Sequence, residues 1–436
     1  MNKDIKSSVE LFSQSLIGFF IQLGLGIFLA RHLTESLYGD YNVAIKLLSI
    51  LVTFSLYGTN VGANRFLAKY IQKHRLDSSI KYLAWNIKLL SITFLISLII
   101  AFIAFIMMWG LHHLNVKHIN HYHLAVYSLW LVPFFALAVI INSLLISSEH
   151  AQISTFYSRI LKYLIILALF VLIALYIDPM LHNVSIILIL FISSVVLSSI
   201  SSLSINRDLL SMIYQGIKQI KATQLTEKKW MTTSSHLIAN NILYAVICAL
   251  DLLVVEVVAG SEVDTGYYAA ALTITYVLWL VPASIYQELK PQLASLLKNK
   301  SKKQELQQRV KKINLISFVL LLLVSFFLIA FENQLLRLFG PSYLNAKTIV
   351  PILAVGYSVA CYTRMSIVLL IMGGYEKIVL QSAVIEFLTM LILLIPSTYY
   401  YGIIGTAVAT SIVITLKGIF CAVIAQRKLG MQTSSF

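Results

Sequence analysis

Residues 87–111 read IKLLSITFLISLIIAFIAFIMMWGL, and Lys88 is the only charged residue among them. An α-helix needs about twenty apolar residues to cross the roughly 30 Å hydrocarbon core of a bilayer. Runs of this kind recur along the chain, in which 59% of the 436 residues are hydrophobic and 12% are charged. A soluble domain could not hydrate so much apolar surface. The sequence therefore predicts an all-α membrane protein that crosses the bilayer many times.

The apolar runs predict about twelve spans, six on each side of a longer polar connection. They cover residues 11–30, 41–63, 87–111, 124–146, 160–177 and 184–203 in the first half, and residues 236–259, 267–286, 313–331, 349–371, 378–395 and 403–425 in the second half. The predicted domains are therefore a six-helix N-terminal lobe (1–210), a cytoplasmic connection (211–235) and a six-helix C-terminal lobe (236–436).

The basic residues gather on alternate connections between the spans. They crowd residues 65–88, 207–229 and 290–312, whereas the connections between these hold few. Cytoplasmic loops carry such an excess of Lys and Arg, so we expect both termini in the cytoplasm and an even number of spans. The net charge of +15 then follows from membrane orientation and indicates no nucleic-acid partner.

The two halves of the chain repeat one another weakly. Residues 37–44, LYGDYNVA, follow the first span, and residues 264–271, DTGYYAAA, follow the seventh. Aligning Gly39 with Gly266 also aligns Tyr41 with Tyr268. Because each half holds an even number of spans, both halves start on the same side of the membrane. We therefore expect the two lobes to be related by a pseudo-two-fold axis normal to the membrane.

The first outer loop and the second span carry a degenerate pattern, made of Arg31-x-Leu33, Gly39-x-Tyr41, Gly58, and Arg65 with Ala68. With this pattern and its span plan, the chain resembles the multidrug/oligosaccharidyl-lipid/polysaccharide exporter superfamily, in its O-antigen or polysaccharide flippase branch. The resemblance implies two lobes around a central cavity. It also implies alternating-access transport of an undecaprenyl-pyrophosphate-linked oligosaccharide from the cytoplasmic to the periplasmic leaflet of a bacterial inner membrane.

Apart from Lys88 and Lys162, which lie at span ends, three basic residues lie inside predicted spans, where a charge costs about 2.5–3.5 kcal/mol on insertion scales. Arg364 lies in a polar break of the tenth span, and its guanidinium could bind a phosphate through two parallel hydrogen bonds. Lys417 lies at a similar depth in the twelfth span, and Lys46 lies near the outer end of the second. We expect all three to line a path for an anionic headgroup. The alternatives are structural pairing with an acid and extension to the membrane surface.

Three acidic residues lie at similar depth. Asp251 and Glu256 are in the seventh span, and Glu386 is in the eleventh. Because desolvation favours the protonated form of a buried carboxyl group, these residues are candidates for coupling transport to ion entry. The alternative is that one of them is a fixed partner of Arg364 or Lys417.

Asn142 and Asn240, in the fourth and seventh spans, are candidates for hydrogen bonds to sugar hydroxyls, or else for hydrogen bonds between helices.

Residues 298–312 are basic with interspersed Leu and Val, as is typical of a helix on anionic lipid headgroups. The expected partners are a lipid-linked glycan and anionic membrane lipids. A polysaccharide polymerase and other assembly proteins are further candidates, and we expect no metal or cofactor.

Two other functions fit part of this pattern. A proton- or sodium-coupled multidrug efflux transporter would depend on Asp251 or Glu386 more than on Arg364. An integral-membrane enzyme that acts on the same lipid carrier would need catalytic groups in an outer loop, and the predicted outer loops are short. The sequence also lacks a phosphate-binding glycine loop followed by Lys. We therefore expect a transporter, not an enzyme, that serves O-antigen and hence lipopolysaccharide or another surface polysaccharide.

Overall fold

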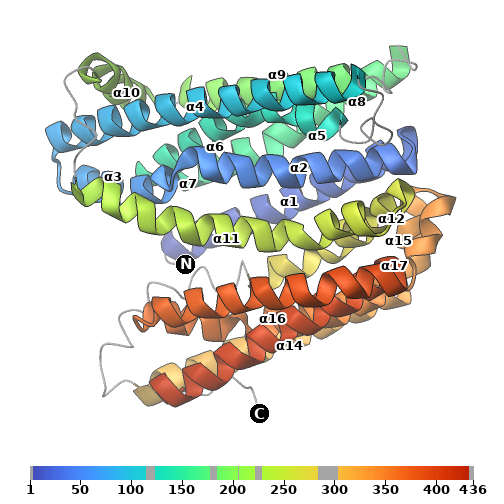
Figure 1. The fold of residues 1–436 in the computed structure, drawn as a ribbon. Coiled ribbons are helices and arrows are strands. Elements are labelled where there is room, and N and C mark those ends of the chain that lie inside the picture. The colour runs from blue at the N-terminus through green and yellow to red at the C-terminus, as the bar shows by residue number, and fades with distance from the viewer. Residues whose placement is uncertain are drawn as a thin grey trace. The chain divides into compact units, whose positions relative to one another are not determined.

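The chain forms long α-helices joined by short turns (Figure 1). The computed structural model describes residues 3–113, 123–176, 184–204, 206–220, 228–282 and 303–431. Within these ranges, nine helices are long and apolar enough to cross a membrane, or ten if the bent pair α9–α10 counts as one span. The prediction of an all-α protein with many membrane-spanning helices is therefore confirmed.

The helices gather into two compact units. The N-terminal unit comprises Met1–Leu25 and Asp40–Val246, and the C-terminal unit comprises Gly26–Gly39 and Ile247–Phe436. The first outer loop thus packs with the second half of the chain, and the start of the seventh predicted span packs with the first half. The bounds of these units differ from those of the lobes predicted from sequence, 1–210 and 236–436, and the lobes stay a prediction.

The N-terminal unit holds most of the first half of the chain. Its elements are α1 (Lys3–His32), α2 (Glu35–Leu56), α3 (Thr59–Gln72), α4 (Leu76–His113), α5 (His123–Ser128), η2 (Leu129–Leu131), α6 (Val132–Ser147), α7 (Ala151–Thr155), η3 (Phe156–Leu161), α8 (Lys162–Tyr176), α9 (Val184–Ser204) and α10 (Arg207–Gln219). The predicted second span is broken between α2 and α3, because Tyr57 and Gly58 adopt left-handed φ angles of 48° and 72°. Sequence hydropathy could not show this break, since both residues suit an apolar run.

An aromatic cluster ties the start of α11 (Lys228–Val258) to α3 and α4. Tyr82 and Trp85 are fully buried on α4, and their rings lie 5.3 Å and 5.7 Å from the Trp230 ring. The Trp230 indole also donates a hydrogen bond of 3.2 Å to the Tyr70 hydroxyl. Such aromatic pairs each contribute about 0.5–1.5 kcal/mol beyond the area they bury. The cluster therefore fixes the chain where it leaves the connection between the two halves.

The C-terminal unit is built around the helix Ile349–Met372, which packs on the helices Lys303–Ala330 and Glu376–Leu429. Besides the end of α11, its elements are α12 (Glu262–Thr275), α14 (Lys303–Ala330), α15 (Glu332–Phe339), η6 (Pro341–Ala346), α16 (Ile349–Met372) and α17 (Glu376–Leu429). Gly402 has φ 57° and ψ −145° and divides α17 into two helices, which match the eleventh and twelfth predicted spans. The two run antiparallel, since the Thr398 and Thr406 hydroxyls lie 2.7 Å apart and the Cys421 thiol donates to Ser382 at 3.6 Å.

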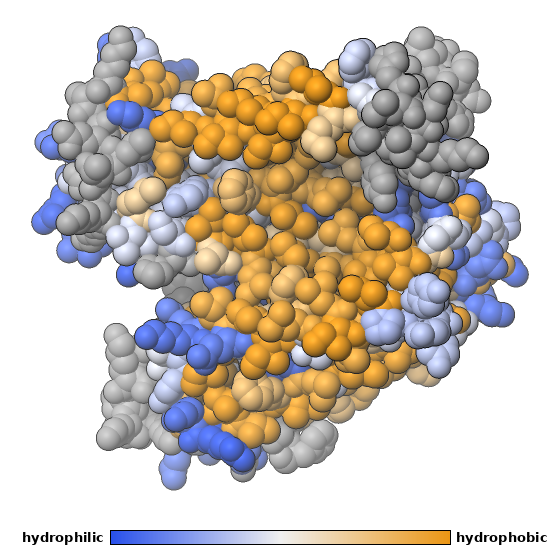
Figure 2. Space-filling view, viewed as in Figure 1, coloured by the Kyte–Doolittle hydropathy of each residue, from blue (hydrophilic) through white to orange (hydrophobic). Residues whose placement is uncertain are grey.

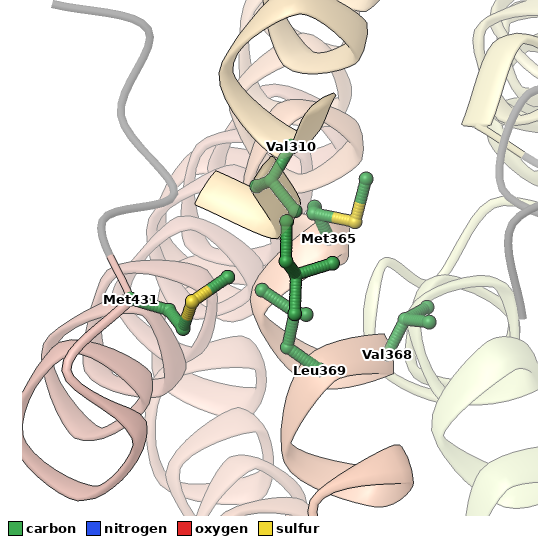
Figure 3. Close-up of a cluster of buried hydrophobic side chains, with 6 residues drawn as sticks. Val310, Met365, Val368, Leu369 and Met431 are labelled. Carbon is green, nitrogen blue, oxygen red and sulfur yellow. The ribbon is translucent and has the colours of Figure 1, made fainter. Parts of the chain in front are cut away.

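One end of the C-terminal unit is held by an apolar core (Figure 3). Its members are Leu306 and Val310 of α14, Met365, Val368 and Leu369 of α16, and Met431 after α17. Deleting one such side chain from a packed core costs about 2–5 kcal/mol. The contact therefore anchors the end of the last helix to α14 and α16.

The surface of the molecule is apolar along the middle of its helices. Figure 2 shows hydrophobic residues over the centre of the visible face and hydrophilic residues near the helix ends. On α4, the large side chains Leu95, Phe102 and Met107 are exposed, and on α14 so are Leu323 and Phe326. Exposed residues of this size in unbroken stripes face lipid rather than water.

The loop between α1 and α2, predicted to face outward, is held by polar contacts in the C-terminal unit. The Arg31 guanidinium donates to the carbonyl oxygens of Leu338 at 2.6 Å and Arg337 at 3.4 Å, at the end of α15. A cation stabilises the C-terminus of a helix, where carbonyl groups are unpaired. The Ser342 hydroxyl donates to the Glu35 carboxylate. We call Arg31, Glu35, Tyr38 and Gly39, with the residues they contact, the outer clasp.

The buried part of the outer clasp is aromatic and glycine-rich. The Tyr38 ring is 1% exposed and lies edge-on to Phe339 and Tyr343, at centroid distances of 6.3 Å and 5.9 Å. A Cβ atom on Gly39 would lie 2.8 Å from the Gly266 nitrogen, and one on Gly266 would overlap the Glu35 carbonyl. The two glycines that the repeat aligns therefore pack against each other and leave no room for a side chain.

A similar close contact sets the distance between α16 and the second helix of α17. A Cβ atom on Gly418 would overlap the Thr363 side chain, whereas one on Gly24 of α1 would meet nothing within 4 Å. Gly418→Ala should therefore lower the free energy of unfolding by about 1–3 kcal/mol, as overpacking does. Thermal unfolding in detergent measures the effect, with Gly24→Ala as the matched control. Equal melting temperatures for both variants would contradict this packing.

Candidate functional site

Arg364 lies on α16 and is partly exposed, and its guanidinium rests on an aromatic ring. Its Cζ atom is 5.2 Å from the centroid of Trp279, in the helical segment that follows α12. The Trp279 ring lies edge-on to buried Tyr357, at 5.7 Å. Within the described residues, no carboxylate forms an ion pair with Arg364. A ring face attracts the cation but leaves its N–H donors available to an acceptor.

Asp251 lies on α11 near the same aromatic residues and is 5% exposed. Its carboxylate accepts hydrogen bonds from the Leu252 backbone N–H at 2.8 Å and from the Tyr268 hydroxyl at 3.4 Å. Asp251 also interacts electrostatically with Tyr357, whose ring contacts Trp279. The Tyr357 and Trp279 rings thus connect a buried carboxylate with the Arg364 cation.

Lys417 and Glu386 form a buried ion pair within α17. The Lys417 Nζ atom lies 2.5 Å from the Glu386 carboxylate, and their side chains are 16% and 5% exposed. The structure thus shows the alternative raised from the sequence, in which Glu386 is a fixed partner of Lys417. Because each charge neutralises the other, neither is free in this arrangement to bind an ion or a headgroup.

The packing of α16 on α17 brings these charges to one level of the C-terminal unit. Thr363 of α16 packs directly on Gly418 of α17, and Arg364 and Lys417 are their immediate neighbours in sequence. Arg364 is eight residues from the end of α16, which places it about 12 Å inside the helix. The predicted similarity in depth of Arg364 and Lys417 therefore agrees with the helix contacts.

The other predicted site residues have separate surroundings. In the N-terminal unit, Asn142 accepts hydrogen bonds from the Ser154 hydroxyl at its carbonyl and side-chain oxygens, at 3.1 Å and 3.3 Å. Lys46 on α2 is partly exposed, and Asn240 on α11 is exposed. Glu256, further along α11, is also partly exposed, and its Oε2 atom has no hydrogen-bond partner among the described residues.

Sequence reasoning did not find the aromatic half of the site. Arg364 rests on Trp279, and Tyr357 packs on that ring, yet each of the two aromatic residues looks like an ordinary apolar residue of its span. One signal was present, since Trp279 lies in the middle of a predicted span, whereas Trp in membrane proteins is enriched at the interfaces.

The ion pair predicts a non-additive pattern of stability. Glu386→Leu alone leaves the Lys417 ammonium buried without a partner and should cost about 3–5 kcal/mol, whereas the double variant Glu386→Leu/Lys417→Met should lie close to the unaltered protein. Thermal unfolding in detergent, as a double-mutant cycle, tests this. Independent, additive losses would show that the two side chains do not stabilise each other.

The sequence matches a protein family described as polysaccharide biosynthesis protein, over residues 6–296. This match covers more than half of the chain and confirms the resemblance drawn from the residues. No curated protein sequence matches the chain.

Solved structures similar to this one belong to transporters. An inward-facing multidrug resistance MATE family transporter of the MOP superfamily has a TM-score of 0.72 and 15% identity over 97% of this chain and 98% of its own. The lipid II flippase MurJ, in an inward closed conformation, has a TM-score of 0.72 and 16% identity over 97% and 87%. A MOP superfamily transporter from Pyrococcus furiosus has a TM-score of 0.64 and 14% identity over 98% and 96%. At such identities the likeness shows the fold alone, and the family match decides membership. The chain therefore belongs to the polysaccharide biosynthesis protein family and has the fold of MOP superfamily transporters.

Proposed function

We propose that this protein is a flippase for undecaprenyl-pyrophosphate-linked oligosaccharide, which it moves from the cytoplasmic to the periplasmic leaflet by alternating access. Its product would serve O-antigen, as part of lipopolysaccharide, or another surface polysaccharide. Membership of a polysaccharide biosynthesis family supports this assignment. The observation that carries it is Arg364, a permanent cation within a span that rests on Trp279 and has no acidic partner among the described residues.

The chemistry of the substrate explains why such a cation is needed. Sugars and phosphates are strongly hydrated and cannot cross hydrocarbon unless the protein replaces their hydrogen bonds. A guanidinium can hold a pyrophosphate through two parallel N–H donors and stays charged at any physiological pH. In this proposal Arg364 binds the pyrophosphate while the lipid tail stays in the bilayer.

The other site residues keep secondary roles in the proposal. Lys417 would join Arg364 if the Glu386 ion pair opens, and Lys46 would bind the headgroup nearer the outer surface. Asn240 and Asn142 would donate to sugar hydroxyls. The carboxyl groups of Asp251, Glu256 and Glu386 are the candidates for ion coupling, because protonation of any of them would change the charge balance around Arg364 and Lys417.

The proposed setting is a bacterial inner membrane, with both termini in the cytoplasm. The partners proposed with the lipid-linked glycan are anionic membrane lipids, a polysaccharide polymerase and other assembly proteins. The proposed lipid-binding stretch is residues 298–312. The structure describes its basic residues Arg309, Lys311 and Lys312, on α14, whereas residues 283–302 are not among the described residues.

Ion-coupled multidrug efflux is the second candidate, and buried Asp251 is the observation that favours it. A carboxylate that accepts a hydrogen bond from Tyr268 and lies near aromatic rings could bind a proton or a cationic drug. The two functions differ in which residue matters. Efflux would depend on Asp251 and would lower drug accumulation in cells, whereas flipping would depend on Arg364.

Loss of the Arg364 guanidinium should stop most glycan flipping. In proteoliposomes with labelled undecaprenyl-pyrophosphate-linked glycan and a leaflet-specific probe, Arg364→Ala should be nearly inactive. Arg364→Lys should keep part of the rate, because an ammonium retains the charge but not the two-donor geometry. The matched control is Arg427→Ala, which removes an exposed basic residue at the end of α17. The assignment fails if folded Arg364→Ala protein flips as fast as the unaltered protein, or if the unaltered protein flips no glycan.

In the proposed alternating-access cycle the α1–α2 loop separates from α15 and η6, so that the outer clasp, which lies within the C-terminal unit, opens during transport. A reversible cross-link between Glu35→Cys and Ser342→Cys, whose native side chains are hydrogen-bonded, should hold the clasp closed and stop flipping. Each single-cysteine variant should stay active under the same oxidation, and a reductant should restore the rate. Full activity of the quantitatively cross-linked protein would show that this contact stays closed throughout the cycle.

A further inference from the structure

Helix α10 is oriented differently from the helix that precedes it. It is bent by 105° from α9, which is long and apolar enough to contribute to a span. The Asn206 side chain accepts a hydrogen bond of 3.0 Å from the Leu209 backbone N–H and so caps its N-terminus. A helix nearly perpendicular to a membrane-spanning one lies close to the plane of the membrane.

One face of α10 is packed on the N-terminal part of α4 (Figure 1). Leu209 is fully buried there. A Cβ atom on Gly216 would lie 3.2 Å from the Leu83 side chain and 3.3 Å from the Ala84 nitrogen, so the two backbones approach closely. This contact fixes the helix and determines which of its side chains point away from the protein.

The outward side of α10 has an apolar edge with a basic edge beside it. The apolar edge is Leu210, Tyr214 and Ile217, spaced four and three residues apart and 37%, 59% and 51% exposed. Arg207 and Lys218 border it, and the Lys218 ammonium lies 4.4 Å from the centre of the Tyr214 ring. The remaining exposed residues are polar and lie further round the helix: Asp208, Ser211, Gln215 and Gln219.

We propose that the outward face of α10 docks on anionic lipid headgroups of the cytoplasmic leaflet, and so holds the connection between the two halves at the membrane surface. The apolar edge would enter the boundary between headgroups and acyl chains, and Arg207 and Lys218 would lie at the depth of the phosphates. Charge complementarity selects this occupant, because an apolar strip bordered by cations matches an anionic membrane better than a neutral protein surface. The inference applies to a transporter of any substrate and rests only on the predicted orientation.

Two labelled positions on nearly opposite sides of α10 test the proposal in the full-length protein. Cys248, Cys361 and Cys421 are replaced by Ala, and single cysteines at Ile217→Cys or Gln215→Cys carry an environment-sensitive fluorophore. The protein is reconstituted in phosphatidylcholine vesicles with or without phosphatidylglycerol. Ile103→Cys, on the lipid-exposed side of α4, serves as the positive control, and thermal unfolding confirms that each variant is folded.

The label at residue 217 should show blue-shifted emission and quenching by spin-labelled lipid, while the label at residue 215 should behave as in water. Spin-labelled phosphatidylglycerol should quench residue 217 more than spin-labelled phosphatidylcholine, and Lys218→Glu should remove that difference. Water-like emission at residue 217 would overturn the proposal. So would energy transfer between donor- and acceptor-labelled copies, which identifies a second protein chain as the occupant, or equal quenching by both lipids before the Lys218 substitution.

Discussion

No water reaches the hydrocarbon core of a bilayer, so a polar group there must find its partner inside the protein. This constraint accounts for most polar side chains along the helices. Hydroxyl groups turn back onto their own helix, as Ser143 donates to the Val139 carbonyl at 3.0 Å and Thr275 to the Ala271 carbonyl at 2.8 Å. Lys417 and Glu386 satisfy the same constraint with opposite charges. Most polar side chains inside the spans thus have a hydrogen-bond or ion-pair partner within the fold.

Arg364 meets the constraint in a different way, and for that reason it is the centre of the proposed site. The Trp279 ring stabilises its charge but accepts few hydrogen bonds, so the guanidinium donors suit an acceptor that arrives from outside. Lys417, at the same level, already has an acidic partner. Arg364 and Lys417 therefore differ in their neighbours and not in their depth. The neighbours make Arg364 a candidate binding group and Lys417 a structural one.

Close approach of helix backbones is the second physical theme. Without a hydrophobic force between helices in lipid, association depends on small residues that allow tight packing and on polar contacts. Gly418 on Thr363 sets the distance between α16 and α17, and Gly39 on Gly266 does the same within the outer clasp. In the outer clasp these glycines lie beside the Arg31 and Glu35 contacts, so one small region combines tight packing with polar contacts.

The amino-acid sequence alone determined the all-α class, the approximate spans and the family. Hydropathy over about twenty residues depends on composition, and composition is local. The tertiary structure decided the break at Tyr57 and Gly58, the packing of residues 26–39 with the second half of the chain, and the partner of each charge. Sequence reasoning named Glu386 as a partner of either Arg364 or Lys417, and it missed Trp279 altogether. Which side chains meet depends on the rotation and crossing of helices far apart in sequence, and no local pattern records that geometry.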